Sequence, residues 1–268
     1  MGEIIRKTKK SQLTVFIIIA IVIVLVIVGA FFIIGANKPK ITAEAITQLN
    51  QDINKQVSSC LKTTSENGIT LISRQGGYYK PKNAYAYSGS DQEPGQFATT
   101  LKNINISYYM LGSKNYFPTN GTVEKEISAY IMDNLPKCVQ IDKFKNRGFN
   151  IEEDKKIIKT TITDSKVFVD LEYPITLSGG ELRSTLSKFS SETNTRLGVI
   201  LNLTSIIMKN QMLSPKNVCL NCLILYKDND FYTQMLIAEK NTIIFIITDV
   251  KGRLAGENFD FIFANKYV

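Results

Sequence analysis

The chain has 268 residues, 44% hydrophobic and 21% charged, so one sizeable core remains after roughly the first forty residues are set aside. Its formal net charge is +8, but the lysines are scattered, which does not indicate a nucleic-acid-binding surface. The sequence has no histidine, which excludes Ser-His-Asp triads, Cys-His pairs and His-ligated metals. We find no complete catalytic, metal or cofactor motif and therefore expect a protein that is not an enzyme.

The N-terminus combines a basic segment with a long apolar run. Residues 1–12 contain four basic side chains and one acidic one, and residues 13–36 are 24 positions without a charge. Roughly 20 apolar residues cross a bilayer, whereas the apolar part of a cleavable signal peptide covers only about 7–15. We therefore predict a transmembrane helix over 13–36, with residues 1–12 as a cytoplasmic leader and the rest of the chain outside the cell.

The boundary between these segments reads Lys9-Lys10-Ser11-Gln12-Leu13-Thr14-Val15-Phe16. It resembles the leader boundary of archaeal type IV pilin-like proteins, which implies a cut between Ser11 and Gln12 and packing of the apolar helix in a filament. Such pilins usually carry Glu at the fifth mature position, where this chain has Phe16. That carboxylate can pair with a neighbouring subunit's free amine inside the apolar core, and Phe16 cannot.

The wider chain resembles signal-anchored surface proteins of small-genome archaea. In that group the anchor is followed by a helix that bears a cysteine, here Cys60, and ends in Gln-Gly-Gly-Tyr, here residues 75–78. An Asn-Leu-x-x-Cys segment at 134–138 and the pair Tyr173-Pro174 also fit. The resemblance implies a place at the cell surface and supplies no activity.

After the apolar run, residues 37–75 show apolar positions at spacings of three and four, which predicts an amphipathic helix. Gly76-Gly77 is a typical helix end. An anchor continued by such a helix makes a stalk. Its apolar face can pack against the chain's own domain or against another subunit, and the sequence leaves this open.

Tyr78, Tyr79, Tyr85 and Tyr87 lie within ten positions. One interpretation is a hairpin packed beneath the domain. The other is an exposed aromatic loop that contacts a partner or a glycan, because aromatic side chains are enriched in interfaces.

The remaining segments predict an α+β domain over 76–268, with an antiparallel sheet covered by helices. We expect a helix over 122–135 closed by Pro136, and a second long amphipathic helix over 181–213 with a break near 193–194. Ser178-Gly-Gly-Glu181 is expected to turn a strand into that second helix. Strands are expected at 105–109, 156–163, 166–173, 231–238, 242–248 and 259–263.

Four cysteines suit paired disulfides outside the cytosol. The simplest pairing joins Cys60 to Cys138 and Cys219 to Cys222, and the resemblance places one cysteine in each segment of the first pair. Four cysteines nevertheless allow three pairings. Cys219-Leu-Asn-Cys222 also has the C-x-x-C spacing of a redox dithiol, although no βαβ pattern surrounds it.

Three glycosylation sequons begin at Asn105, Asn120 and Asn202, and Asn120 sits at a predicted turn.

These observations favour a single-pass cell-surface protein with a structural, adhesive or pilin-like assembly role. Its expected partners are the lipid bilayer and either a second copy of itself, another surface protein or a glycan. An extracytoplasmic thiol-redox factor or other enzyme is the alternative, and a solute- or peptide-binding receptor is a further one.

Overall fold

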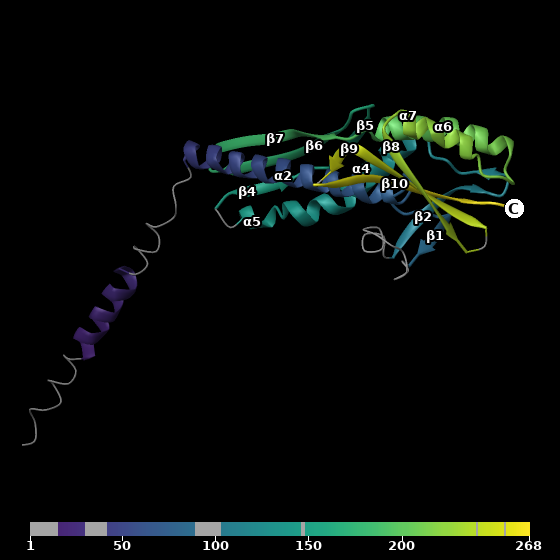
Figure 1. Ribbon diagram of the computed structural model, residues 1–268. Coiled ribbons are helices and arrows are strands. Elements are labelled where there is room, and N and C mark those ends of the chain that lie inside the picture. Colours follow the sequence, from purple (N-terminus) through teal and green to yellow (C-terminus); the bar gives the residue numbers. More distant parts are fainter. Residues whose placement is uncertain (1–15, 30–41, 89–102, 146–147, 240, 255) are drawn as a thin grey trace, which may run out of the picture. The chain divides into compact units, whose positions relative to one another are not determined.

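The computed structural model describes residues 16–29, 42–88, 103–145, 148–239, 241–254 and 256–268 (Figure 1). It comprises two units, Met1–Ala43 and Glu44–Val268, which are considered separately below.

The first unit contains one described helix, residues 16–29. Within the described ranges, no helix is both long enough and apolar enough to cross a membrane. This finding corrects the predicted transmembrane helix over 13–36. Residues 30–41, over which that helix was expected to run on into the next one, lie outside the described residues.

Helix α2 (Ala43–Arg74) runs along much of the length of the second unit (Figure 1). The predicted apolar stripe is its buried face, and side chains along it are covered from Ile46 to Ser73. The helix is therefore part of the folded unit and not a free-standing stalk. It ends at two glycines with positive φ, +70° at Gly76 and +85° at Gly77, which favours glycine over other residues.

Helix α4 (Asn120–Val139) lies antiparallel to α2, because contacts that move along one helix move backwards along the other. Cys60 of α2 is bonded to Cys138, Gly68 lies against the Tyr130 ring, and Gly77, just after α2, lies against Val123. Pro136 does not close α4 as predicted. It sits in the last turn, where its missing N–H removes a single helical bond, and the helix ends at Gln140 in the left-handed conformation. The short helix α5 (Asp142–Lys145) follows.

Among the described residues, the strands form two sheets. The first consists of β4 (Asn150–Glu153), β5 (Ile157–Ile162), β6 (Lys166–Gly179) and β7 (Leu182–Asn194). The long strand β6 pairs antiparallel with β7 on one side and with β5 and then β4 on the other. Its odd-numbered residues from Val167 to Leu177 are buried, which explains the strict alternation of the sequence.

Strand β7 corrects the predicted helix over 181–213, since only its second half, α6 (Leu197–Leu213), is helical. Leu182, Leu186 and Phe189 have spacings that fit a helix, but pairing with β6 along almost the whole strand outweighs that local pattern. The Ser178–Glu181 segment is correspondingly a hairpin turn, with φ of +60° at Gly180, rather than a helix start.

The second sheet has the order β1-β2-β10-β9-β8, with the two-residue strand β3 (Lys114–Asn115) paired to β2. Its longer strands are β1 (Ala84–Tyr87), β2 (Ile104–Leu111), β8 (Phe231–Ala238), β9 (Thr242–Leu254) and β10 (Glu257–Lys266). Strands β2 and β10 run parallel, so this sheet is mixed and not antiparallel as expected. The predicted final three strands are all present.

Helix α6 contacts both sheets. At its start, a Cβ atom on Gly198 would lie 2.7 Å from the backbone carbon of Thr163, in the β5–β6 turn. Further along, Met208 of α6 accepts a hydrogen bond from Asn265 of β10 (3.8 Å). Two short helices, η1 (Leu220–Leu223) and α7 (Ile224–Asp228), then lead into β8.

Candidate functional site

The Gln-Gly-Gly-Tyr segment after α2 leads into a pocket, which its last residue, Tyr78, lines. Buried Ser107 of β2 donates to the Gln75 carbonyl oxygen (2.5 Å), and the Tyr109 hydroxyl donates to the Gly76 carbonyl oxygen (2.9 Å). The Gln75 carboxamide, oriented so that its nitrogen faces acceptors, donates to the carbonyls of Tyr78 (3.1 Å) and Tyr79 (2.9 Å). A Cβ on Gly77 would lie 3.0 Å from both Pro118 and Val123, so the turn is held tightly against its neighbours.

The pocket has a volume of about 300 Å³ and is lined by aromatic and polar side chains together. Three tyrosines, Tyr78, Tyr108 and Tyr116, contribute to its wall. The lining is completed by Lys80, Pro81, Lys82, Asn83, Ser107 and Glu126. Pockets of this kind, largely apolar with a few placed polar groups, are typical of small-ligand sites.

Hydrogen bonds fix the wall in position. The Tyr78 hydroxyl donates to the Tyr116 carbonyl oxygen (3.0 Å), and the Tyr79 backbone N–H donates to the Glu126 carboxylate (2.9 Å). The Tyr108 N–H donates to the Asn83 carbonyl oxygen (2.9 Å). Burial, followed by the nearby Glu126 carboxylate, raises the pKa of Tyr78, so its hydroxyl remains protonated at neutral pH.

The charged groups of the pocket differ in what they are bound to. Lys80 forms an ion pair with Asp133 (2.9 Å) and lies 4.4 Å from the centre of the Tyr79 ring. The hydrogen bond that Lys80 donates to the Asp133 carboxylate is the main cause that raises the pKa of Lys80. Lys82 is exposed at the rim and Glu126 is half-buried in the wall, so the pocket offers one positive and one negative group.

The structure separates the four tyrosines of the predicted aromatic cluster. Tyr78 lines the pocket, whereas the Tyr79 ring packs edge-on against Tyr130 (5.1 Å between ring centres). Tyr85 and Tyr87 of β1 pack against the isoleucines of the second sheet. Residues 89–102, which follow β1 and Ser88, lie outside the described residues.

Sequence reasoning missed Tyr108, Tyr116 and Glu126. Tyr108 lies in β2, Tyr116 directly follows β3, which pairs with β2, and Glu126 lies in α4. Their convergence depends on contacts between distant segments, and only the glycine pair at 76–77 signalled a close approach.

A second hollow of about 440 Å³ lies over β6 and β7, at a register shift after Glu172. Its polar side chains, Asp170, Glu172, Lys188 and Ser190, are all exposed on the outer face of the sheet. Because these groups are in full contact with water, the hollow is a weaker candidate than the tyrosine-lined pocket.

All four cysteines are paired, Cys60 with Cys138 and Cys219 with Cys222, which are the pairings that the sequence favoured. The first bond joins α2 to α4 across a sequence separation of 78 residues and is covered, with Cys60 3% exposed. The second spans three residues around η1. Cys222 is buried and Cys219 is half-buried.

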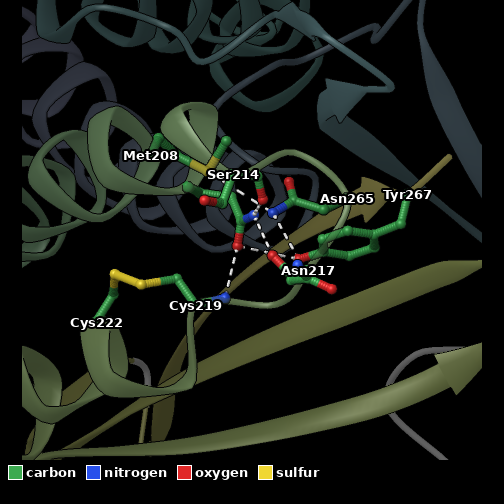
Figure 2. Close-up of a disulfide and its surroundings, with 8 residues drawn as sticks. Met208, Ser214, Asn217, Cys219, Cys222, Asn265 and Tyr267 are labelled. Atoms are coloured by element: carbon green, nitrogen blue, oxygen red, sulfur yellow. Dashed lines mark hydrogen bonds between the residues drawn. A yellow bond between two sulfur atoms is a disulfide. The ribbon is translucent and has the colours of Figure 1, made fainter.

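The loop before Cys219 is organised by one side chain, Gln211 of α6 (Figure 2). Its amide nitrogen donates to the carbonyl oxygens of Ser214 (3.1 Å) and Asn217 (2.7 Å). Its amide oxygen accepts from the Cys219 backbone N–H (2.9 Å) and from the Tyr267 hydroxyl (3.3 Å). Figure 2 shows the Cys219 side chain pointing away from this cluster, toward Cys222.

A buried ion pair, also missed by the sequence analysis, ties α6 to the second sheet. The guanidinium of Arg196, just before α6, donates to both carboxylate oxygens of Asp249, which is fully buried. Arg196 also donates to the Asn229 carbonyl oxygen (2.9 Å) and stacks on the Phe231 ring. These contacts are structural, because they leave no open side of the carboxylate.

The three sequons differ in their surroundings. Asn105 and Asn202 are exposed, and Asn120 is half-buried at the start of α4. The hydroxyl residues of the first and third sequons, Ser107 and Thr204, are buried and hydrogen-bonded within the fold. Ser11 and Gln12, the expected cleavage boundary, lie outside the described residues.

No family model, curated protein or solved structure matches this chain. In the part of the chain that the structure describes, no group of three or more acidic or cysteine side chains is placed to hold a metal ion.

Proposed function

We propose that this chain is an extracytoplasmic protein with an adhesive role, and that its tyrosine-lined pocket binds a sugar ring of a surface glycan. The pocket carries the proposal, because it combines three tyrosines with groups that donate and accept hydrogen bonds. Sugars need both properties, since their C–H faces pack on aromatic rings while their hydroxyls require polar partners.

The charges of the pocket favour a neutral sugar over an anionic one. Lys82 at the rim is opposed by Glu126 in the wall, and Lys80 is already paired with Asp133. A ligand with a full charge would meet a like charge at one of these positions. A neutral hexose or N-acetylhexosamine can accept from the lysine and donate to the carboxylate.

The disulfides support the extracytoplasmic placement. Pairing of every cysteine in the chain, including the buried bond between α2 and α4, is typical of oxidising compartments. Thiol trapping of the native protein in intact cells checks this. We expect no free thiol at Cys60 or Cys138 and labelling of the protein by a membrane-impermeant amine reagent, and free thiols at these two positions in a protein inaccessible to that reagent would contradict it.

A screen of the purified full chain against immobilised glycans tests the sugar proposal. We expect retention on glycans with a terminal neutral sugar and competition by the free monosaccharide. Tyr116→Ala should abolish retention, whereas Tyr232→Ala, which removes an exposed tyrosine of β8, should leave it unchanged. Equal retention of both variants would place any glycan binding elsewhere on the molecule.

A further inference from the structure

The Cys219–Cys222 bond differs from Cys60–Cys138 in what it can contribute to the fold. A disulfide restrains the unfolded chain more when it closes a longer loop. Cys60–Cys138 closes a loop with a sequence separation of 78 residues, whereas Cys219–Cys222 closes one of only three, around η1. The short bond is therefore a weak restraint on the unfolded chain.

The segment before Cys219 is held in place without the disulfide. Gln211 makes hydrogen bonds to Ser214, Asn217 and Cys219, and Tyr267 of the C-terminal strand region holds the amide oxygen of Gln211 in turn (Figure 2). After Cys219 the chain enters a helical turn in which the Cys222 N–H donates to the Cys219 carbonyl oxygen (3.1 Å). None of these contacts uses a cysteine sulfur atom, so we expect them to persist when the sulfur–sulfur bond opens.

The two cysteine residues are also unequally exposed to solvent. Cys222 is 8% exposed, whereas Cys219 is half-buried and its side chain points away from the Gln211 cluster. Leu220 and Ile224, one helical turn apart beside Cys219, are 60% and 58% exposed. An incoming thiol can therefore reach Cys219 first, next to two apolar side chains in contact with water.

From these observations we infer that Cys219–Cys222 is a thiol–disulfide exchange site that accepts electrons from a protein dithiol whose cysteine is flanked by apolar residues. The inference is independent of the proposed glycan pocket, which lies on other elements. Reversible exchange needs an exposed cysteine, a second cysteine within bonding reach and a loop that survives reduction. The structure shows the first two, and the hydrogen bonds around Gln211 are expected to provide the third.

The exchange proceeds in two steps. A thiolate of the partner attacks the Cys219 sulfur, the Cys219–Cys222 bond breaks, and Cys222 leaves as a thiolate that takes up a proton. The partner's second thiolate then attacks the sulfur of the partner's first cysteine in the mixed disulfide, and Cys219 leaves as a thiolate that takes up a proton. The partner dithiol is thereby oxidised by two electrons to a disulfide, and Cys219–Cys222 is reduced to a dithiol.

Graded reduction of the oxidised full chain by dithiothreitol tests the lability of the bond. Alkylation and peptide mass spectrometry then give the reduced fraction of each disulfide separately. We expect Cys219–Cys222 to open at least about tenfold faster than Cys60–Cys138, with an unchanged far-ultraviolet circular dichroism spectrum. Equal or slower opening, or loss of the fold when only this bond is reduced, would overturn the inference.

Two single-thiol variants test which sulfur is attacked. In Cys222→Ser the remaining Cys219 should form a mixed disulfide with oxidised glutathione about tenfold faster than Cys222 does in Cys219→Ser. Equal rates, or the reverse order, would contradict the assignment of Cys219 as the accessible sulfur.

A pair of peptides tests the apolar flanks. The Cys222→Ser protein should react several-fold faster with an activated cysteine peptide flanked by leucines than with one flanked by serines, a preference of the size expected for small apolar contacts. Leu220→Ser combined with Ile224→Ser should remove this preference. Ile237→Ser, which alters a still more exposed apolar residue of β8, should retain it. A preference that survives the double change would exclude these residues as the contact surface.

Discussion

Arg196 and Asp249 hold three segments together at the residue scale. The carboxylate of Asp249 accepts from Arg196 and from the backbone N–H of Lys251 (2.9 Å), and the guanidinium reaches the carbonyls of Asn229 and Asp230. Burial acts to raise the pKa of Asp249, but the hydrogen bonds from Arg196, Lys251 and Gly252 outweigh it, and the net shift is downward. The pair therefore stabilises the fold as an ionised carboxylate.

Asp249→Asn should lower the free energy of unfolding by about 2–3 kcal/mol at pH 7, because it leaves the partly exposed Arg196 without its counter-ion. The folded pKa lies below the unfolded value of about 3.9, so this contribution is complete above about pH 4 and is lost as the pH falls through the folded pKa. Urea unfolding between pH 2.5 and 7 measures this. A difference between wild type and variant that stays constant across the range would contradict it.

Asp260 should show the opposite dependence. It is buried and accepts a hydrogen bond from Thr248 (2.7 Å), and burial raises its pKa above the ordinary value. A raised folded pKa gives stability that is present below about pH 4 and is lost as the pH rises through the folded pKa.

Asp260→Asn should therefore stabilise the protein at pH 7 relative to wild type, by about 1 kcal/mol or less, and lose this advantage at acid pH. The same urea series measures it. Asp170→Asn on the exposed face of β6 is the control and should change stability little at either pH. Destabilisation of Asp260→Asn at pH 7 would show that the carboxylate is needed in its charged form.

At the scale of elements, α6 depends on one close approach to the β5–β6 turn. A Cβ on Gly198 would overlap backbone atoms of Thr163, which cannot rotate away as a side chain could. The glycine is therefore required by packing, although alanine is the better helix former by about 1 kcal/mol.

Gly198→Ala should lower the free energy of unfolding by about 1–3 kcal/mol, because overpacking shifts the helix away from the turn. Gly121→Ala near the start of α4 is the matched control, since a Cβ there meets no atom within 4 Å. Thermal melts of both variants provide the measurement. A neutral or stabilising Gly198→Ala would mean that α6 tolerates a shift from this position.

The disulfides should also differ as cross-links between elements. From loop length, Cys60→Ser with Cys138→Ser should cost roughly 4–5 kcal/mol, and Cys219→Ser with Cys222→Ser roughly 2 kcal/mol or less. Urea unfolding of the two double variants compares them directly. Equal losses would mean that native-state strain or residual structure, and not loop length, sets the contribution of each bond.

The sequence predicts those elements whose local pattern agrees with their tertiary surroundings. Strand β6 alternates because one face is buried, and α2 carries an apolar stripe because one face packs in the domain. Strand β7 was predicted as a helix because its leucine and phenylalanine spacing is ambiguous, and pairing with β6 decides its conformation. The parallel pairing of β2 with β10 joins residues far apart in the chain, which no local pattern indicates.

The candidate site was predictable only in part for the same reason. Tyr78 was a candidate from its place after the glycine pair, but Tyr116 and Glu126 reach the pocket through β3 and α4. The C-x-x-C motif was visible in the sequence. The hydrogen bonds of Gln211 to Cys219 and Tyr267 could not be predicted, because they depend on how α6 packs against the C-terminal segment.

At the scale of the whole molecule, the α2–α4 pair connects the long disulfide to the pocket. Cys60–Cys138 joins the middle of α2 to the C-terminal end of α4, and the C-terminal end of α2 approaches the first turn of α4, where Gly77 lies against Val123. The pocket lining at Tyr78 and Glu126 therefore belongs to a helix pair that the disulfide cross-links. The Cys219–Cys222 segment belongs to other elements, so opening it should leave the pocket unchanged.

The most direct test is calorimetric titration of the full chain with the monosaccharide that competes best in the glycan screen. We predict one site per chain, at least about tenfold weaker binding in Tyr116→Ala, and unchanged affinity in Tyr232→Ala, because only the first variant removes a wall of the pocket. Tyr116→Ala must also unfold cooperatively, which thermal melting checks. No heat of binding from any neutral sugar, or equal affinity of a folded Tyr116→Ala and wild type, would contradict the proposed function.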